Sequence, residues 1–160
     1  GPVNLQTIGQ INTIDVETAH EMNESILKLL KEKEYDYIFM TAAVGDYYLK
    51  DIPDSKIKST DQTITINLQK SPDILKNISV NSNAKILGFA LETNNGENEA
   101  LKKMKNKNLD FIALNYANED GAGFDVNTNH IYLFSKSGNK KEFKLERKDR
   151  IAKEIIKFII

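Results

Sequence analysis

The sequence contains no cysteine, which excludes disulfides, thiol nucleophiles and cysteine-based metal sites. Its two histidines, His20 and His130, lie far apart and do not have the spacing of a metal-ligand pair. No combination of serine, histidine and aspartate suggests the triad of a hydrolase. We therefore expect any chemistry of this chain to proceed without a thiol, a zinc ion or a triad.

Long apolar runs and an excess of charge of one sign are also missing. No run approaches the ~18 apolar residues of a membrane span, and no secretory signal is visible at the start. The net charge of the 160 residues is -1, so no overall field favours nucleic acid or an anionic membrane. We expect a cytoplasmic protein of one domain, with a small appendage at most, that binds neither nucleic acid nor membrane.

Segments typical of strands alternate with segments typical of helices. Thr18 and Glu21 have the spacing of a capping box, which marks the start of a helix. Ser71-Pro72 places a capping side chain before a proline, which predicts another helix start. The alternation predicts an α/β fold, a Rossmann-like parallel sheet flanked by helices. The expected strands are 11–16, 35–43, 85–91 and 111–115. One further helix is expected to begin at 94–97, and another is expected to span 151–160.

Two further segments follow a different pattern. Ile64, Ile66 and Leu68 alternate with polar residues, as in a half-exposed antiparallel sheet. The segments 130–134 and 142–145 look like the two strands of a hairpin. We assign these regions to a small antiparallel β subdomain or flap. The predicted division is a nucleotide-binding core of residues 1–49, 70–127 and 146–160 and a flap of residues 50–69 and 128–145.

The stretch from Met40 to Lys58, MTAAVGDYYLKDIPDSKIK, has the features of a ligand site. An apolar run ends there in small residues, including Ala42 and Ala43, which let a ligand approach the backbone closely. The end of a buried strand is the usual position of a site in an open α/β sheet. Asp46 follows and can hydrogen-bond a ribose or a base, or it can simply cap the turn that Gly45 begins.

Two pairs of lysines can supply positive charge to this site. Lys56 and Lys58 lie on one face of an extended segment and suit a polyphosphate, although lysines on an edge strand also discourage aggregation. Lys103 and Lys107 are four residues apart on the helix that begins at 94–97, and they can reach phosphates across the top of the sheet. That helix is rich in lysine, so both side chains can equally be solvated.

Two other positions have both a structural and a functional interpretation. Pro72-Asp73 marks a helix start, and the first-turn amides of a helix can also bind an anion. Phe89 lies within a buried strand, where a phenylalanine is most often part of the core, but Gly88 beside it leaves room for stacking on a ligand base. The residues alone leave both alternatives open.

Six motifs follow one another along the chain: AAVGDY, KIK, KSPDIL, GFALETNN, KNLDFIALN and GFDVNTNHIYLF. In this order they resemble the bacterial CTP-dependent phosphopantothenoylcysteine synthetases of coenzyme A biosynthesis, and the resemblance spans nearly the whole chain. It implies a ligase that joins 4'-phosphopantothenate to L-cysteine through an acyl-cytidylate made from CTP. It further implies that Mg²⁺ assists the nucleotide step and that the enzyme is a homodimer, with the flap mediating dimerisation.

The resemblance also implies roles for individual residues. Lys56 falls on the family's important flap lysine, for which we expect a catalytic role, and Asp46 falls on its CTP-contacting aspartate. No metal ligand is assigned in this chain. The remaining positions expected to bind CTP are Ala42, Ala43, Pro72, Asp73, Ile74, Leu75, Phe89, Lys103 and Lys107.

The sequence departs from the family pattern at Gly45, Ser59, Ser71 and Leu91, where the family usually has alanine, lysine, asparagine and alanine. The family's first unit, a glycine-rich turn and an ISNRSSG-like segment, is not among these 160 residues, so we expect a C-terminal fragment whose own activity is in question. FMN is implied only if a decarboxylase half is fused upstream.

Two other functions are compatible with the same sheet. The first is a non-catalytic nucleotide-binding or dimerisation module derived from the synthetase. The second is a nicotinamide-dependent reductase, which is disfavoured because no G-x-G-x-x-G follows a strand.

Overall fold

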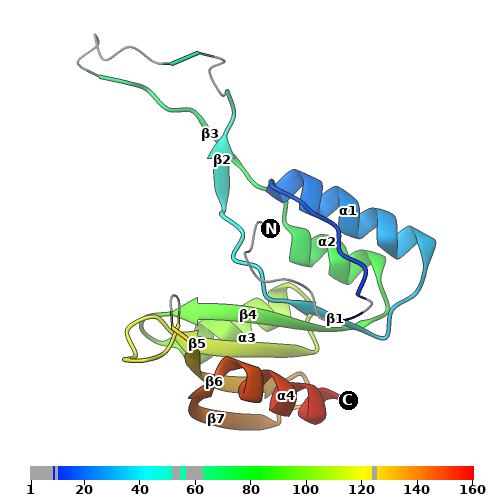
Figure 1. The fold of residues 1–160 in the computed structure, drawn as a ribbon, viewed down its shortest axis with the longest axis vertical. Helices are drawn as coiled ribbons and strands as arrows, with labels where there is room; N and C mark the ends of the chain where they lie inside the picture. The colour runs from blue at the N-terminus through cyan, green and yellow to red at the C-terminus, as the bar shows by residue number, and fades with distance from the viewer. Residues whose placement is uncertain (1–8, 10, 52–54, 57–62, 124–125) are drawn as a thin grey trace.

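A five-stranded sheet forms the centre of the computed structural model, which describes residues 9, 11–51, 55–56, 63–123 and 126–160. The strand order is β1-β4-β5-β6-β7, with β1, β4 and β5 mutually parallel and β6 and β7 antiparallel to their neighbours. A two-stranded antiparallel ribbon, β2 and β3, projects away from this sheet (Figure 1). The strands are β1 (Tyr37–Met40), β2 (Tyr47–Leu49), β3 (Leu68–Lys70), β4 (Lys85–Glu92), β5 (Phe111–Tyr116), β6 (Thr128–Ser135) and β7 (Lys140–Arg147).

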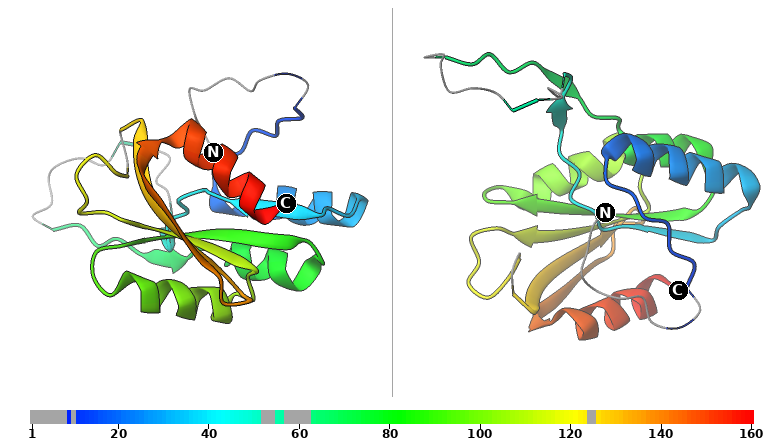
Figure 2. Two further views of the ribbon diagram at one scale, coloured as in Figure 1. Left: turned by 90° about the horizontal axis from the view of Figure 1, so that it is seen from below. Right: turned by 45° about the horizontal axis from the view of Figure 1, so that its top comes forward.

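Helices cover both faces of the sheet (Figure 2). Apolar residues of α1, α2 and α3 pack into one core layer, and those of α4 pack into a second layer on the opposite face. Among the described residues, no helix has the length and apolar character needed to cross a membrane. The helices are α1 (Ala19–Glu32), α2 (Ile74–Asn81), α3 (Gly96–Asn106) and α4 (Lys148–Ile159).

The central strand β4 contributes to both core layers. Ile86 and Ala90 face the layer beneath α1, α2 and α3, whereas Leu87 faces the layer beneath α4. All three side chains are 2% exposed. A strand that is covered on both faces has a nearly continuous apolar sequence, which is why 85–91 is recognisable as a buried strand.

The structure confirms the predicted fold class and the helix start at Thr18. The amide of Glu21 donates to Thr18 Oγ1 at 3.1 Å, and the amide of Thr18 donates to Glu21 Oε2 at 3.2 Å. This reciprocal pair is the predicted capping box, and α1 begins directly after it.

Some predicted boundaries are wrong. Residues 11–16 form no strand, and the side chains of Ile11 and Ile14 are exposed, since no described strand pairs with this segment. The expected strand 35–43 is shorter, because β1 covers only Tyr37–Met40. The second helix begins at Ile74 with Asp73 as its N-cap rather than Ser71, because the Asp73 carboxylate accepts a hydrogen bond from the Lys76 amide at 3.1 Å.

The assignment of residues 128–145 to a flap is also wrong. β6 pairs with β5 and β7, so the hairpin extends the main sheet. The physical reason is burial: Ile131 and Leu133 pack beneath α4, and Phe134 packs into the opposite core layer. The alternation that suggested a separate sheet belongs to β7, an edge strand with one exposed face.

Among the residues that the structure describes, one part forms a separate arm, which we define as the β2–β3 ribbon and the described residues between its strands. β2 pairs with β3 in the register Tyr48 to Gln69. The predicted alternating strand is shorter than expected, since Ile64 and Ile66 lie outside β3, and Ile57 lies outside the described residues. The aliphatic side chains of the described arm, Leu49, Ile64, Ile66 and Leu68, are exposed to solvent.

Gly96→Ala should destabilise the protein. A Cβ at this position would lie 2.7 Å from Cε1 of Tyr116, at the end of β5, and an aromatic ring cannot yield as a flexible side-chain tip does. We expect the free energy of unfolding to fall by about 1–3 kcal/mol, the usual cost of overpacking. Urea titration measures this, with the exposed Lys105→Ala on the same helix as control. Equal stabilities of Gly96→Ala and wild type would contradict the predicted clash.

Candidate functional site

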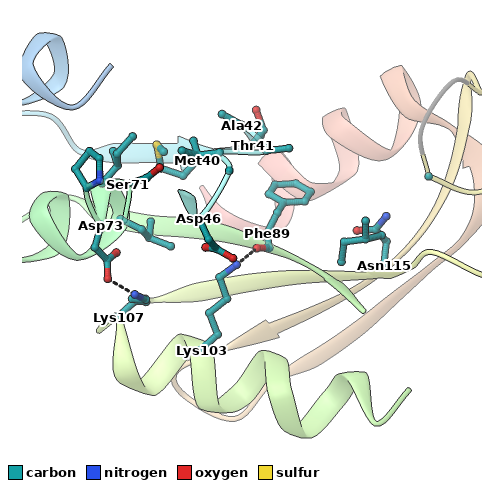
Figure 3. Close-up of a pocket in the computed structure, with 18 of the residues that line it drawn as sticks. Met40, Thr41, Ala42, Asp46, Ser71, Asp73, Phe89, Lys103, Lys107 and Asn115 are labelled. Atoms are coloured by element: carbon teal, nitrogen blue, oxygen red, sulfur yellow. Dashed lines mark hydrogen bonds and ion pairs between the residues drawn. The ribbon is translucent and has the colours of Figure 1, made fainter. Parts of the chain in front are cut away.

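A cleft of about 830 Å³ lies at the carboxyl ends of β1, β4 and β5 (Figure 3). Parallel strands end at the same edge of a sheet, and ligands of open α/β proteins bind there. The volume lies within the range of roughly 300–1,000 Å³ typical of small-molecule sites. The lining residues are 40–46, 70–75, Phe89, Leu91, Lys103, Lys107, Asn115, Gly123, Asn129 and Lys148.

The loop after β1 and the start of α2 form one wall of the cleft. The amide of Ser71 donates to the backbone carbonyl of Asp46 at 2.8 Å and so joins the loop to the residues before α2. Ala42 and Ala43 are exposed in this wall, so their backbone is accessible to a ligand. The wall therefore combines accessible backbone with a carboxylate on Asp46.

Two lysines of the α3 region reach the cleft from beneath the sheet. Lys103 Nζ donates to the backbone carbonyl of Phe89 at 2.8 Å, and Lys107, at the C-cap of α3, forms an ion pair with Asp73. Both lysines are half-buried, whereas Lys102 and Lys105 on the same helix are exposed. The lysine-rich helix thus places Lys103 and Lys107 at the cleft, whereas Lys102 and Lys105 lie on its exposed face.

The ion pair also determines the charge state of Asp73. Burial opposes ionisation of this carboxyl group, but the hydrogen bonds from Lys107 and from the Lys76 amide outweigh burial and lower the pKa of Asp73. The carboxylate is therefore charged at neutral pH and holds the Lys107 ammonium at the start of α2.

The opposite wall is a loop held by side chains of β6 and α4. The Gly123 amide donates to Asn129 Oδ1 at 3.2 Å, and Lys148 Nζ donates to the Gly123 carbonyl at 2.7 Å. Gly123 has a φ of 101°, a conformation that glycine adopts without strain. Asn115, in β5, lines the cleft beside this wall, and Figure 3 shows it apart from the Lys107–Asp73 pair.

His130, next to Asn129, connects the same loop to the hairpin. Its ring contacts Glu119 of the loop through Nδ1 and Glu142 of β7 through Nε2, the latter at 3.0 Å. The side chain is 13% exposed. Burial favours the neutral ring, but the two carboxylates stabilise the imidazolium and raise the pKa of His130.

All predicted site residues except Lys56 line this one cleft. Lys56 is exposed and is not among the lining residues, and its neighbour Lys58 lies outside the described residues. Whether the lining residues bind CTP stays a prediction.

The residues of the opposite wall of the cleft were not predicted from the sequence. Asn115 could have been found, because it stands near the end of a buried parallel strand. Gly123, Asn129 and Lys148 carry no such local signal, since they reach the cleft only through the pairing of β6 with β5.

The whole chain, residues 1–160, matches the family described as DNA/pantothenate metabolism flavoprotein, C-terminal domain. It is 39% identical over 163 residues to a cysteine/cysteine sulfinic acid decarboxylase of an unknown prokaryotic organism, and 38% identical over 161 residues to the coenzyme A biosynthesis bifunctional protein CoaBC of Bacillus subtilis strain 168. These matches cover 100% and 99% of the chain, which spans 45% and 39% of the two relatives.

A solved structure has the same fold. The crystal structure of the C-terminal domain of a coenzyme A biosynthesis bifunctional protein CoaBC aligns with a TM-score of 0.78 and 30% identity. The alignment covers 99% of this chain and 69% of that one. The chain therefore spans less than half of the curated relatives and about two thirds of the solved domain.

His130 should make the protein less stable as the pH rises. Its folded-state pKa lies above the value of about 6.5 of an unperturbed histidine. The stabilisation is therefore fully present below a pH of about 6.5 and is lost as the pH rises through the folded-state pKa. We expect the free energy of unfolding, from urea titrations between about pH 5.5 and 9, to fall across this interval in wild type but not in His130→Gln.

His20→Gln is the matched control, because the ring of His20 packs edge-on against Tyr48 rather than between carboxylates. It should retain the pH dependence of wild type. The same pH dependence in wild type and His130→Gln would contradict the assignment to His130.

Proposed function

Because the chain belongs to the DNA/pantothenate metabolism flavoprotein C-terminal domain family, we propose that it is the ligase part of a phosphopantothenoylcysteine synthetase. In this proposal it joins 4'-phosphopantothenate to L-cysteine, with CTP as the activating nucleotide, in the cytoplasm of its cell. The proposal extends to this chain a role in coenzyme A biosynthesis, for which the Bacillus subtilis relative is named, although the chain matches 39% of that protein.

The observation that carries the proposal is the pair of half-buried lysines in the cleft. Lys103 directs its ammonium group to the Phe89 carbonyl of β4, and Lys107 directs its ammonium group to Asp73 at the start of α2. Nucleotidyl transfer needs positioned cations more than it needs a protein nucleophile. The cleft offers those cations, and the chain has no cysteine that would suggest covalent catalysis.

The proposed reaction has two steps. The carboxylate of 4'-phosphopantothenate attacks the α-phosphorus of CTP, forms the acyl-cytidylate and releases pyrophosphate. The amine of L-cysteine then attacks the acyl carbon, loses a proton to solvent and displaces CMP. Lys103 and Lys107 offset the negative charge that collects on the phosphates in the first step. Phe89 and the backbone at Ala42 and Ala43 hold the cytosine, while Asp46 contacts the ribose or base.

The donor groups of the cleft fit a Mg²⁺ ion that arrives with the nucleotide. Mg²⁺ is usually held by one or two carboxylates together with substrate phosphates and water. Asp46 lines the cleft as an exposed carboxylate, whereas Asp73 is engaged by Lys107. Among the described residues, no group of three or more histidine, aspartate or glutamate side chains could hold a metal alone. When bound, Mg²⁺ would supply further charge neutralisation at the phosphates.

The proposal includes a homodimer formed through the arm. Leu49, Ile64, Ile66 and Leu68 are 44–61% exposed on a ribbon that has two strands in the described part of the chain. An isolated two-stranded ribbon is marginally stable, so apolar side chains on it need cover from another surface. A second copy of the chain supplies that cover in our proposal.

The test of the function uses the full-length protein. Incubation with CTP, 4'-phosphopantothenate and L-cysteine should yield phosphopantothenoylcysteine, CMP and pyrophosphate in equal amounts, as measured by mass spectrometry and a pyrophosphate assay. Without cysteine, the acyl-cytidylate should accumulate. Binding of CTP without any of these products would favour the non-catalytic nucleotide-binding module, and equal use of ATP would remove the case for CTP specificity.

Lys103→Ala and Lys107→Ala should each weaken CTP binding. Loss of one phosphate contact should cost about 1–3 kcal/mol, as for hydrogen bonds between charged groups. Calorimetry on the full-length protein measures this. The matched controls are Lys102→Ala and Lys105→Ala, because both side chains are exposed and neither lines the cleft. Preference for CTP over ATP should persist, since a lysine does not read a base edge. CTP affinities equal to those of the controls would contradict a phosphate contact.

Lys56→Gln should reduce kcat by about 10²-fold or more, the effect of removing one electrostatic stabiliser. The reason is its position on the arm, from which it can close over a ligand. Steady-state kinetics measure kcat, and Lys28→Gln, an exposed change on α1, serves as control. A kcat close to that of wild type, in a variant with an unchanged circular dichroism spectrum, would exclude a catalytic role.

A further inference from the structure

The positive charges of the cleft are unevenly compensated. In the described part of the chain four lysines line it, Lys70, Lys103, Lys107 and Lys148, and only Lys107 forms an ion pair. Lys103 and Lys148 donate instead to the backbone carbonyls of Phe89 and Gly123. A carbonyl satisfies one N–H of an ammonium group but does not neutralise it, so both lysines keep their charge for an anionic ligand.

Lys103 and Lys148 approach the cleft from opposite faces of the sheet. Lys103 belongs to α3, which packs on one core layer, and Lys148 opens α4, which packs on the other. In the proposed function the phosphates of CTP lie near Lys103, Lys107 and the start of α2. Lys148 is exposed and forms no ion pair within the described part of the chain, so its charge is available to a second anionic group on the far side of the cleft.

Amide groups lie beside this second charge. Asn129 Oδ1 accepts hydrogen bonds from the amides of Gly123 and His130, which fixes the carboxamide in place. Its Nδ2 donates no hydrogen bond to the described part of the chain, and neither does the side chain of Asn115. An ammonium with spare N–H groups and a fixed carboxamide are donors suited to a phosphate monoester, which presents three acceptor oxygens.

We propose that Lys148 and Asn129 bind the phosphate group of 4'-phosphopantothenate, an inference that rests on the proposed function. The phosphate and the carboxylate stand at opposite ends of this acid. When the phosphate lies at Lys148, the carboxylate points towards the nucleotide side of the cleft, where it meets the α-phosphorus of CTP. Lys148 thus distinguishes the phosphorylated acid from free pantothenate.

The experiment compares 4'-phosphopantothenate with pantothenate on the full-length protein. Lys148→Gln removes the charge and keeps a donor for the Gly123 carbonyl, so the loop retains its hydrogen bond. We expect kcat/KM for 4'-phosphopantothenate to fall about 10- to 100-fold, the range for loss of one charged hydrogen bond, while kcat/KM for pantothenate stays within about twofold. Calorimetry without CTP should show the same loss of affinity for 4'-phosphopantothenate.

Lys153→Gln is the control, because Lys153 lies on the same helix, is exposed and does not line the cleft. It should match wild type with both acids. If Lys148→Gln lowers kcat/KM equally for both acids, Lys148 acts on the carboxylate end of the substrate or only holds the loop at Gly123. Either result would overturn the inference. Unchanged kinetics would overturn it as well. Failure of wild type to make phosphopantothenoylcysteine is a separate result, which would refute the proposed function itself.

Discussion

The site depends on how closely the start of α2 approaches β4. Gly88 lies opposite Met40 of β1 and Ile112 of β5, so it sits in the middle of the parallel strands. A Cβ at Gly88 would lie 2.7 Å from Leu109 and 3.2 Å from Leu75, both of which pack against the strand. The missing side chain leaves room against β4 for Leu109 and for Leu75 in the first turn of α2, and the Leu75 contact helps to hold the start of α2 beside the cleft.

The start of α2 also helps to hold the charges of the cleft in place before any ligand binds. Asp73 caps α2 and at the same time pairs with Lys107 at the end of α3, so one carboxylate links two helices on the same face of the sheet. Lys103 is oriented by a carbonyl of β4 itself. Charged side chains that the folded protein already holds in place need little reorganisation when phosphates bind. Such preorganisation is how enzymes make electrostatic stabilisation effective.

Local signals in the sequence predicted the elements that depend on local interactions. The capping box at Thr18 and the apolar run of 85–91 specify α1 and β4 almost without tertiary context. The hairpin of 128–145 was recognised as a hairpin but assigned to the wrong sheet, because alternation reports burial of one face and not which strand lies alongside. For the same reason the sequence did not reveal Lys148 as a site residue. Lys148 follows β7 and reaches the cleft only because that hairpin joins β5.

The arm shows the opposite relation between sequence and environment. Its isoleucines and leucines alternate as if one face were covered, yet Ile64, Ile66 and Leu68 are about 60% exposed, whereas equally apolar residues of β4 are buried. Burial of a leucine or isoleucine side chain stabilises by roughly 1.5–3 kcal/mol, so leaving several exposed forgoes a large share of a typical domain's stability. The homodimer that we propose would cover these side chains. Lys56 lies in the same arm and does not line the cleft of its own chain, so in the proposed homodimer the position of the arm would determine which cleft Lys56 can reach.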